Sequence, residues 1–374
     1  MAYISGAGLT KVKSHWDLSL EDLAVEAGIK ALEDSGHERV DAIVVANSFS
    51  GTANGQEDLS SIIVDHLGIR DVPSFKVSLE GASGAAAVIT ATTLVNSGAA
   101  KRVLVIGVEK MSDVTALEDL TLVSSTSLDR RFEREIGATT HSQHALIMRT
   151  YMRRYGIEEE DFGHFPVLMH ENACAVPHAQ FRYRLKLENY MKSPYLAEPL
   201  KLFDVPAEGD GAAAVVISEK GEVKISGFSI SSDKVMLSLR EDLLKLDTVR
   251  ASARRALSMA GLDLNSISFV KIHDNSSALA YLQLESIGLA EEGKAPQLTA
   301  EGKFSRDGEM PVNPEGGLKA RGYPVGASAV YQAAEAYLQL AGRAGESQIN
   351  GAKSCLLVSL SGIGSSAASL VLTR

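Results

Sequence analysis

Two distant segments of this chain share one pattern, and this internal repeat limits the possible folds more than any other feature of the sequence. One copy, GASGAAAVITATTLVNSGAAKRVLVIG, runs from Gly81 to Gly107; the other, GASAVYQAAEAYLQLAGRAGESQINGAKSCLLVSLSG, runs from Gly326 to Gly362. Each copy opens with Gly-Ala-Ser, continues as a helix of small residues and leads, after a glycine, into an apolar strand. Coincidence between two alanine-rich helices is the alternative. A duplication predicts two similar α/β units around a shared core.

Strands and helices alternate in both halves of the chain. The strands are expected at AYISGAG (2–8), DAIVVANSF (41–49), RVLVIGVEKM (102–111), VKISGFSI (223–230) and SFVKIHD (268–274). The helix LEDLAVEAGIKALEDSG is expected to end at Gly36. This alternation predicts an α/β fold with a buried sheet and helices on both of its faces.

The repeat divides the chain into an N-terminal half, 1–219, and a C-terminal half, 220–374. A region of about 113–205 does not fit the repeat and carries most of the His, Arg and Tyr residues. Its apolar residues recur at helical spacing, so we expect a structured helical insertion rather than a linker. Insertions on a rigid scaffold commonly shape the binding site.

Charge and cysteine content exclude several classes of protein. The formal net charge of -10 argues against general binding to nucleic acid or to anionic membranes. Only two cysteines occur, Cys174 and Cys355, which favours a reducing cytoplasm. The first residues lack the pattern of a signal peptide, and the apolar runs fall short of a membrane span. We therefore expect a cytoplasmic protein without a membrane segment.

Several segments together resemble the thiolase superfamily over essentially the whole chain. Those that match the general family are GASGAAA (81–87), VPAEGDGAAAVVIS (205–218), KIHDNSSALAYLQLESIGL (271–289) and NPEGGLKARGYPVGAS (313–328). GVEKMSD (107–113) and HENACAVPHAQFRY (170–183) are similar to archaeal and sterol-carrier-type thiolases, the acetyl-CoA acetyltransferase-like branch. The resemblance implies a duplicated fold of two βαβαβαββ halves in a five-layered α-β-α-β-α arrangement. It also implies a homodimer or higher homo-oligomer.

The resemblance shows which catalytic groups this chain lacks. In the family a cysteine takes the acyl group, a histidine activates it and a second cysteine moves the substrate proton. The position of the nucleophile is held here by Gly81, that of the second cysteine by Asn275 and that of the Gly-His-Pro histidine by Tyr323. Of the four family residues only His273 remains. Cys174 and Cys355 lie elsewhere and do not replace the missing thiols.

The rest of the family's site could still bind a thioester. Backbone N–H groups of Gly81, Gly362 and Gly364 match the family's oxyanion donors, although the same glycines also suit tight turns. His273 is expected to point from a strand end into the cleft between the halves. Tyr323 can donate or remove a proton without a covalent intermediate, or it can simply fill the space of a lost histidine.

Charged and metal-binding candidates carry weaker signals. Lys319 with Arg321, Arg130 with Arg131, and Arg153 with Arg154 are candidates for CoA phosphates, although a solvated face explains most such pairs. The histidines of the insertion lack the tight spacing of a zinc site, so no metal is expected; they are His141, His144, His164, His170 and His178.

Three functions compete. The first is non-covalent C–C bond chemistry, of the retro-aldol or Claisen type, on an acyl-CoA thioester, as in the thiolase-like aldolases of steroid side-chain breakdown. Those proteins also lack the nucleophile and carry tyrosine in the Gly-His-Pro loop, but this chain departs from them in keeping His273.

The second function is that of a catalytically silent acyl-CoA-binding or scaffold subunit, associated with an OB-fold, zinc-ribbon partner protein as archaeal thiolases are. The third is an ordinary acetyl-CoA C-acyltransferase, which the missing cysteines disfavour in mechanism. In each case a coenzyme A thioester is the substrate or ligand, and no covalently bound cofactor is expected.

Overall fold

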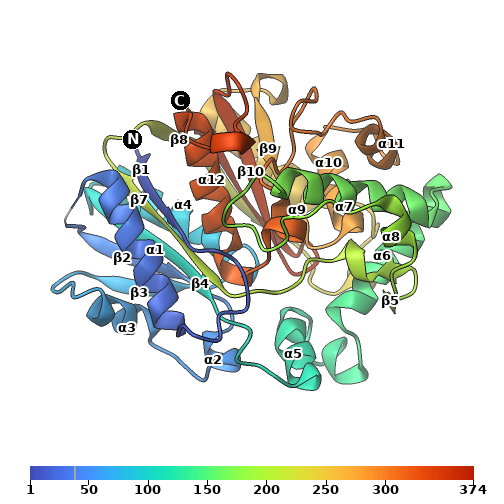
Figure 1. Ribbon diagram of the computed structural model, residues 1–374, viewed down its shortest axis with the longest axis horizontal. Helices are drawn as coiled ribbons and strands as arrows, with labels where there is room; N and C mark the ends of the chain where they lie inside the picture. Colours follow the sequence, from blue (N-terminus) through green and yellow to red (C-terminus); the bar gives the residue numbers. More distant parts are fainter. Residues whose placement is uncertain (38) are drawn as a thin grey trace.

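The strands of both halves join in one nine-stranded sheet in the computed structural model, which describes residues 1–37 and 39–374 (Figure 1). The strand order is β3-β2-β4-β7-β1-β8-β11-β10-β9. The strands of the first half are β1 (Tyr3–Leu9), β2 (Ala42–Ala46), β3 (Ser74–Val77), β4 (Arg102–Glu109) and β7 (Gly211–Ser218). Those of the second half are β8 (Val223–Ser232), β9 (Phe269–Lys271), β10 (Ser354–Ser361) and β11 (Ser366–Thr373). A separate hairpin pairs β5 (Tyr195–Ala197) with β6 (Leu200–Lys201).

The two sets of strands have the same order and the same directions. In the first half β2 is parallel to β4, which is antiparallel to β7, and β7 is antiparallel to β1. In the second half β9 is parallel to β10, which is antiparallel to β11, and β11 is antiparallel to β8. The sets meet where β1 pairs with β8 over Tyr3↔Lys224 and Ile4↔Val223. The α/β fold expected from the sequence is confirmed, and hydrogen bonding runs continuously from one half into the other.

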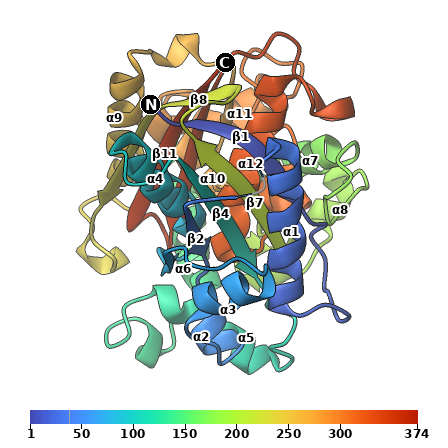
Figure 2. The ribbon, with the colours of Figure 1, turned by 90° about the vertical axis from the view of Figure 1, so that its left-hand side faces the viewer.

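Helices cover the sheet in layers (Figures 1 and 2). α1 (Leu20–Ser35) and α3 (Leu59–His66) share an apolar core with one face of the first set of strands. α4 (Ser83–Asn96) and α12 (Ser328–Ala341) share a second core with strands of both sets. α9 (Asp247–Ala260) and α10 (Ser277–Ile287) share a third core with the second set. The two sets of strands therefore form two β layers with α4 and α12 between them, and the order of layers is α-β-α-β-α.

The small residues of the repeat allow α4 and α12 to lie close together. A Cβ atom at Gly84 would lie only 2.6 Å from the backbone nitrogen of Val330, so a larger residue would separate the two helices. α4 begins two residues after Gly81, and α12 follows the loop that carries Tyr323. The contact between the helices thus fixes two segments of the candidate site relative to each other.

The insertion forms four helices, α5 (Leu117–Ser124), α6 (Thr140–Tyr155), α7 (Glu159–Ala173) and α8 (Leu187–Met191). α6 and α7 lie against α10 of the second half and α8 packs on α7, whereas α5 contacts the short helix α2 (Ser50–Ala53) of the first half. α11 (Ala295–Ala300) is a short helix of the second half. α7 packs against α10 through aromatic rings: Phe162 meets Tyr281 at a tilt, and Phe165 meets it edge to face. Ring contacts of this kind add to area burial, so the insertion is firmly attached. Within residues 1–37 and 39–374, no helix has both the length and the apolar character needed to cross a membrane.

Candidate active site

A cavity of about 310 Å³ lies where the two halves and the insertion meet. Its walls combine apolar side chains with hydroxyl, imidazole and carboxyl groups. The lining residues are Phe49, Glu80, Leu120, Thr121, Ser124, Ser125, Thr139, Thr140, His141, His144, Leu196, Leu202, Val205, Pro206, Glu208, Asn275, Tyr323, Val325 and Gly362. Two residues predicted to be catalytic, Asn275 and Tyr323, are among them.

Gly81 is enclosed on the side where a side chain would project. A Cβ atom there would lie 2.6 Å from Cε1 and 2.7 Å from Nε2 of His273, and 2.6 Å from the carbonyl oxygen of Leu360. Separations below 3.0 Å are not tolerated by real Cβ atoms. The space that a nucleophilic side chain would need at Gly81 is therefore taken by the ring of His273.

His273 lies just past the end of β9 and is fully buried. Its Nδ1 lies 3.3 Å from the hydroxyl of Ser359, and its Nε2 lies 3.4 Å from the hydroxyl of Tyr323. Burial, helped by the positive charge of Arg321, lowers the pKa of His273 to about 3. The ring is therefore neutral at ordinary pH and lies behind Tyr323.

Tyr323 places its ring between His273 and the cavity. The two rings meet edge to face, with centroids 5.5 Å apart. Burial, together with the negative charges of Glu80 and Glu208, raises the pKa of Tyr323 well above its ordinary value. The hydroxyl thus keeps its proton and acts as a hydrogen-bond donor rather than as a base.

Asn275 offers the cavity a polar group that is not used by the protein. Its Nδ2 donates to the carbonyl oxygen of Gly362 at 3.4 Å, whereas its buried Oδ1 has no hydrogen-bond partner among the described residues. An amide can both donate to and accept from a ligand. Asn275 is therefore suited to binding rather than to proton transfer.

Glu80 occupies the backbone donors that were expected to bind a thioester oxygen. Its Oε2 accepts a hydrogen bond from the N–H of Gly362 at 2.6 Å, and the N–H of Gly81 also donates to its carboxyl group. Burial raises the pKa of Glu80 in spite of these bonds and of a further one from Tyr323. The remaining expected donor, the N–H of Gly364, is bonded to the carbonyl oxygen of Ser361 at 3.1 Å. Sequence reasoning missed Glu80, although it directly precedes Gly81.

Glu208 is a second carboxyl group on the cavity wall that sequence reasoning missed. It forms a backbone bridge with Tyr323, and its Oε2 is buried without a hydrogen-bond partner in the described part of the chain. Burial and the charges of Glu109 and Glu80 raise the pKa of Glu208 to about 7. A carboxyl group with such a pKa can take and return protons near neutral pH.

Histidines of α6, in the insertion, line another part of the cavity wall. His144 is 2% exposed, and neither of its ring nitrogens has a hydrogen-bond partner in the described residues. Burial lowers the pKa of His144 to about 3 and also lowers the pKa of neighbouring His141. Residues 1–37 and 39–374 contain no group of three or more His, Cys, Asp or Glu side chains arranged to hold a metal ion. These rings therefore present neutral hydrogen-bonding groups to the cavity.

Lys319 and Arg321, expected from the sequence to contact CoA phosphates, lie inside the protein. Nζ of Lys319 donates to the carbonyl oxygen of Val205 at 2.5 Å, and burial lowers the pKa of this lysine to about 8. Arg321 is fully buried, with Nε 3.2 Å from a carboxylate oxygen of Glu335 and its guanidinium 4.7 Å from the ring centre of Tyr331. Neither side chain is placed to meet a phosphate at the surface.

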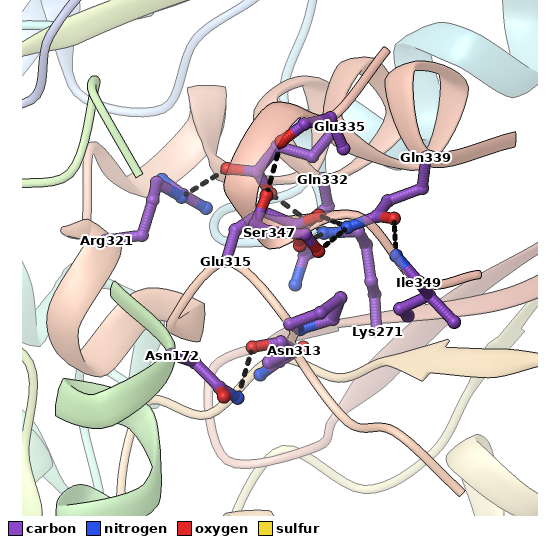
Figure 3. Close-up of polar contacts among 12 residues, drawn as sticks. Asn172, Lys271, Asn313, Glu315, Arg321, Gln332, Glu335, Gln339, Ser347 and Ile349 are labelled. Carbon is purple, nitrogen blue, oxygen red and sulfur yellow. Dashed lines mark hydrogen bonds and ion pairs between the residues drawn. The ribbon is translucent and has the colours of Figure 1, made fainter. Parts of the chain in front are cut away.

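Arg321 instead belongs to a buried network of charges and amides (Figure 3). Lys271, at the end of β9, pairs with Glu315 and, at 3.0 Å, with Glu335. Gln339 donates to Glu315 at 2.8 Å. The network joins the strand that leads to His273 with the loop that leads to Tyr323.

Asp274 ties the same two segments together more directly. It accepts hydrogen bonds from the N–H groups of Leu318 and Lys319 at 2.8 and 3.1 Å, and from Nδ2 of Asn313 at 2.8 Å. The Asp274 carboxylate therefore holds the turn that ends in Tyr323 against the strand end that carries its neighbour, His273. Burial raises the pKa of Asp274 to about 6.

Neither cysteine is placed to act as a nucleophile in this cavity. Cys355 is fully buried in β10, and burial raises the pKa of its thiol. Cys174 follows α7, where its thiol donates to the carbonyl oxygen of His170 at 3.3 Å. Neither residue lines the cavity.

Sequence comparisons relate the whole chain to known proteins. Residues 2–221 match the family described as Thiolase, N-terminal domain, and residues 229–374 match the family described as Thiolase C-terminal domain-like. An acetyl-CoA acetyltransferase of Methanothermobacter thermautotrophicus is 36% identical over 381 residues, covering 99% of each chain. Human sterol carrier protein 2 is 30% identical, covering 97% of this chain and 70% of that protein.

Solved structures share the fold. The Ltp2-ChsH2(DUF35) aldolase superposes with a TM-score of 0.86 at 23% identity, covering 100% of this chain and 97% of the other. Human mitochondrial 3-ketoacyl-CoA thiolase in complex with CoA superposes with a TM-score of 0.77 at 17% identity, covering 100% of this chain and 98% of the other. At these identities the superpositions establish the architecture alone.

Proposed function

This chain belongs to the thiolase family, and from that premise we propose that it binds an acyl-CoA thioester and breaks or forms a C–C bond without an acyl-enzyme intermediate. The reaction is of the retro-aldol type. The thioester end of the substrate enters the cavity that Tyr323, Asn275 and Glu80 line. CoA is present in the structure of the human mitochondrial 3-ketoacyl-CoA thiolase, which supports the choice of ligand.

The enclosure of Gly81 is the observation that carries this proposal. We assign Gly81 to the position of the thiolase nucleophile because it opens the GASGAAA segment. Glycine supplies no nucleophile, and two ring atoms of His273 lie 2.6 and 2.7 Å from the position of a Cβ atom. Covalent acyl transfer at this position is then impossible. A reaction that needs only hydrogen-bond donors and a proton acceptor remains open.

The cavity groups suit a reaction of that kind. Tyr323 donates a hydrogen bond to the carbonyl oxygen of the substrate, and neutral His273 keeps the tyrosine hydroxyl in place. Asn275 binds a polar group of the acyl chain through its unpartnered Oδ1. The Tyr323 contact stabilises the negative charge that develops on the carbonyl oxygen as the C–C bond breaks, and the Asn275 contact positions the acyl chain.

The test combines mass and product measurements. The protein is incubated with acetyl-CoA, acetoacetyl-CoA and β-hydroxyhexanoyl-CoA, and its intact mass is recorded while acetyl-CoA formed from the hydroxyacyl compound is quantified by chromatography. We expect acetyl-CoA and an aldehyde from the hydroxyacyl thioester and no acyl adduct on the protein. A stoichiometric adduct on Cys174 or Cys355 would show that the reaction is covalent after all.

A catalytically silent acyl-CoA-binding subunit is the second candidate. The observation that favours it is the carboxyl group of Glu80, which already occupies the N–H of Gly362. The Ltp2-ChsH2(DUF35) aldolase combines a chain of this fold with a second protein, which supports the expectation that this chain also associates with a partner protein. A catalytically silent subunit would bind CoA but form no product from any thioester. The acetyltransferase activity named for the relatives is the least compatible with an enclosed Gly81.

A further inference from the structure

Two carboxyl groups from distant segments face the same cavity beside Tyr323. Glu80 precedes α4, whereas Glu208 precedes β7. Glu208 forms a backbone bridge with Tyr323, and Glu80 accepts a hydrogen bond from the tyrosine hydroxyl. Two such groups near each other are not both ionised easily, because like charges in a partly buried site repel. The pair therefore tends to hold one proton.

The hydrogen bonds of the two carboxyl groups differ, and this difference separates their roles. Glu80 is fixed by the N–H groups of Gly81 and Gly362, the donors that the family directs at a thioester oxygen. Glu208 keeps Oε2 without a hydrogen-bond partner in the described residues. Glu80 therefore lies where the thioester oxygen would bind, and Glu208 has an oxygen free to receive a proton.

The other walls of the cavity indicate what kind of acyl chain fits. Polar atoms that are buried and unpartnered within the described residues occur on three lining side chains besides Glu208, namely Ser125, His144 and Asn275. These three side chains are at most 7% exposed. A ligand with hydroxyl or carbonyl groups would satisfy such atoms. Since no Lys or Arg occurs among the described lining residues, an acyl chain with its own negative charge has no cation to meet it.

We infer that Glu208 and Glu80 form the acid–base pair of the retro-aldol reaction, with an uncharged β-hydroxyacyl thioester as substrate. This inference rests on the proposed function. Burial raises the pKa of Glu208 to about 7 and also raises that of Glu80, which agrees with a carboxylate base beside a neutral carboxylic acid.

With these two groups as base and acid, the protons and electrons of the retro-aldol step balance. The carboxylate of Glu208 takes the proton of the β-hydroxyl group, and the oxygen forms the carbonyl of the aldehyde as the C–C bond breaks. The bonding electrons pass to the thioester as an enolate, whose oxygen accepts a hydrogen bond from the protonated Glu80. Glu208 then returns its proton to the α-carbon, which gives acetyl-CoA. No oxidant, reductant or other co-reactant is required.

The experiment measures cleavage of β-hydroxyhexanoyl-CoA to acetyl-CoA and butanal by wild-type protein and by Glu208→Gln, Glu208→Asp and Glu80→Gln. Glu219→Gln, at an exposed position beyond the end of β7, is the matched control. We expect Glu208→Gln to lower kcat by about a hundredfold or more with KM within about threefold. Glu208→Asp should recover part of the rate, and Glu219→Gln should leave it unchanged.

The pH profile separates a base from a structural residue. Wild-type kcat/KM should fall as the pH drops below about 7, because protonated Glu208 cannot accept the hydroxyl proton. The titratable groups that face Glu208 are Glu80, Glu109, Tyr323, His141 and His144. Residual activity of Glu208→Gln should lack this acidic limb, whereas Glu80→Gln should retain it.

A binding measurement addresses the substrate class. By calorimetry with Glu208→Gln, to prevent turnover, β-hydroxyhexanoyl-CoA should bind about tenfold more tightly than hexanoyl-CoA. Adipoyl-CoA, which ends in a carboxylate, should bind more weakly than hexanoyl-CoA. Tighter binding of adipoyl-CoA would overturn the assignment of an uncharged chain.

The outcomes are distinguishable. Equal kcat values for wild type and Glu208→Gln would overturn the acid–base pair while the proposed function stands. If the wild-type protein cleaves no β-hydroxyacyl thioester, the proposed function itself falls, and the pair falls with it. Should Glu208→Gln fail to fold by circular dichroism, an undiminished rate in Glu208→Asp and Glu80→Gln would equally overturn the pair.

Discussion

The carboxyl group of Glu80 accepts a hydrogen bond from the backbone N–H of Gly362 at 2.6 Å, across the junction between the two halves of the chain. Glu80 makes this contact from a left-handed backbone conformation, with φ of 46°. Residues other than glycine rarely adopt such a backbone conformation, because their Cβ atom crowds the backbone. Strain of this kind persists only where the surrounding structure holds it, and it concentrates at functional sites.

The strain at Glu80 predicts an unusual order of stabilities. Glu80→Ala loses the hydrogen bonds and keeps the strain, whereas Glu80→Gly loses the same bonds but relieves the strain. We therefore expect Glu80→Gly to be more stable than Glu80→Ala by about 1 kcal/mol. Urea denaturation of both variants measures the difference. An alanine variant as stable as the glycine variant would mean that the backbone is not strained in solution.

Enclosure of Gly81 predicts a large effect from a single methyl group. Gly81→Ala should lower the free energy of unfolding by about 1–3 kcal/mol, since the methyl group would overlap the His273 ring and the Leu360 carbonyl. Gly28→Ala, in the middle of α1, is the control: its Cβ atom would meet only side-chain atoms, none closer than 3.2 Å. That variant should change stability by less than about 1 kcal/mol. Similar losses in the two variants would argue against the enclosure.

Much of the fold could be predicted because it rests on local patterns. The apolar runs at 42–46 and 102–109 are strands, and the GAS-opened segments are the helices α4 and α12. The join of both strand sets into one sheet could not be predicted. It depends on a two-residue contact between β1 and β8, which leaves no signal in the periodicity of either strand.

The candidate site was predictable only in part. Gly81, His273 and Tyr323 do come together, as positions matched to one family should. Lys319 and Arg321 look like surface cations in the sequence. In the structure Lys319 donates a hydrogen bond to the buried carbonyl oxygen of Val205, and Arg321 forms an ion pair with Glu335. A sequence gives the charge of a side chain but not its partner, which for Arg321 comes from α12 and for Lys319 from the distant Val205.

Glu80 and Glu208 escaped notice for a related reason, and His144 was considered only as a metal ligand. Each lies in a segment whose sequence suits a turn or an amphipathic helix. Their common feature is the cavity they face, which forms only when the insertion folds over the second half. The one local signal was the Glu-Gly pair at 80–81, which is too common to be specific.

His144 should contribute to the acid sensitivity of the protein. Its pKa is about 3 in the folded protein, against an ordinary value of 6.5, so unfolding takes up a proton between these two values. The free energy of unfolding should therefore fall as the pH is lowered below about 6.5, by up to about 1.4 kcal/mol per pH unit for this residue. His144→Leu should lose stability less steeply over this range. Urea titrations at several pH values measure the slope difference, and parallel slopes would contradict it.

His144→Leu also tests whether the unpartnered ring serves a ligand. An apolar side chain leaves no buried nitrogen unsatisfied, so the variant should be as stable as wild type at neutral pH. It should nevertheless bind β-hydroxyhexanoyl-CoA more weakly while its affinity for hexanoyl-CoA changes little. Equal losses for both thioesters would indicate that the ring matters only for the shape of the cavity.

The buried ion network of Figure 3 should be sensitive to the loss of one partner. Arg321→Met leaves Glu335 with less compensation inside the protein, and we expect a loss of about 3–5 kcal/mol in the free energy of unfolding. The control is Arg130→Gln, which removes an exposed ion pair with Glu135 and should change stability by less than about 1 kcal/mol. Comparable losses would mean that the network contributes no more than a surface pair does.

Tyr323 offers a direct choice between a catalytic group and an aromatic filler. Its ring packs in a small apolar cluster with Phe49, Met111 and Val325, and phenylalanine would preserve that packing. Tyr323→Phe removes only the hydroxyl, which contacts His273 and Glu80. If the hydroxyl donates to the reacting carbonyl, kcat for β-hydroxyhexanoyl-CoA should fall by about a hundredfold or more, while the free energy of unfolding changes by less than about 1.5 kcal/mol. If the ring only fills space, both quantities stay near their wild-type values.

Tyr323→His completes the comparison, because it restores the imidazole of the family's Gly-His-Pro loop without a thiol for it to activate. With Gly81 enclosed and no cysteine on the cavity wall, this variant should form no acyl-enzyme from acetoacetyl-CoA. An acyl adduct in its intact mass would mean that the chain holds a nucleophile outside the cavity described here.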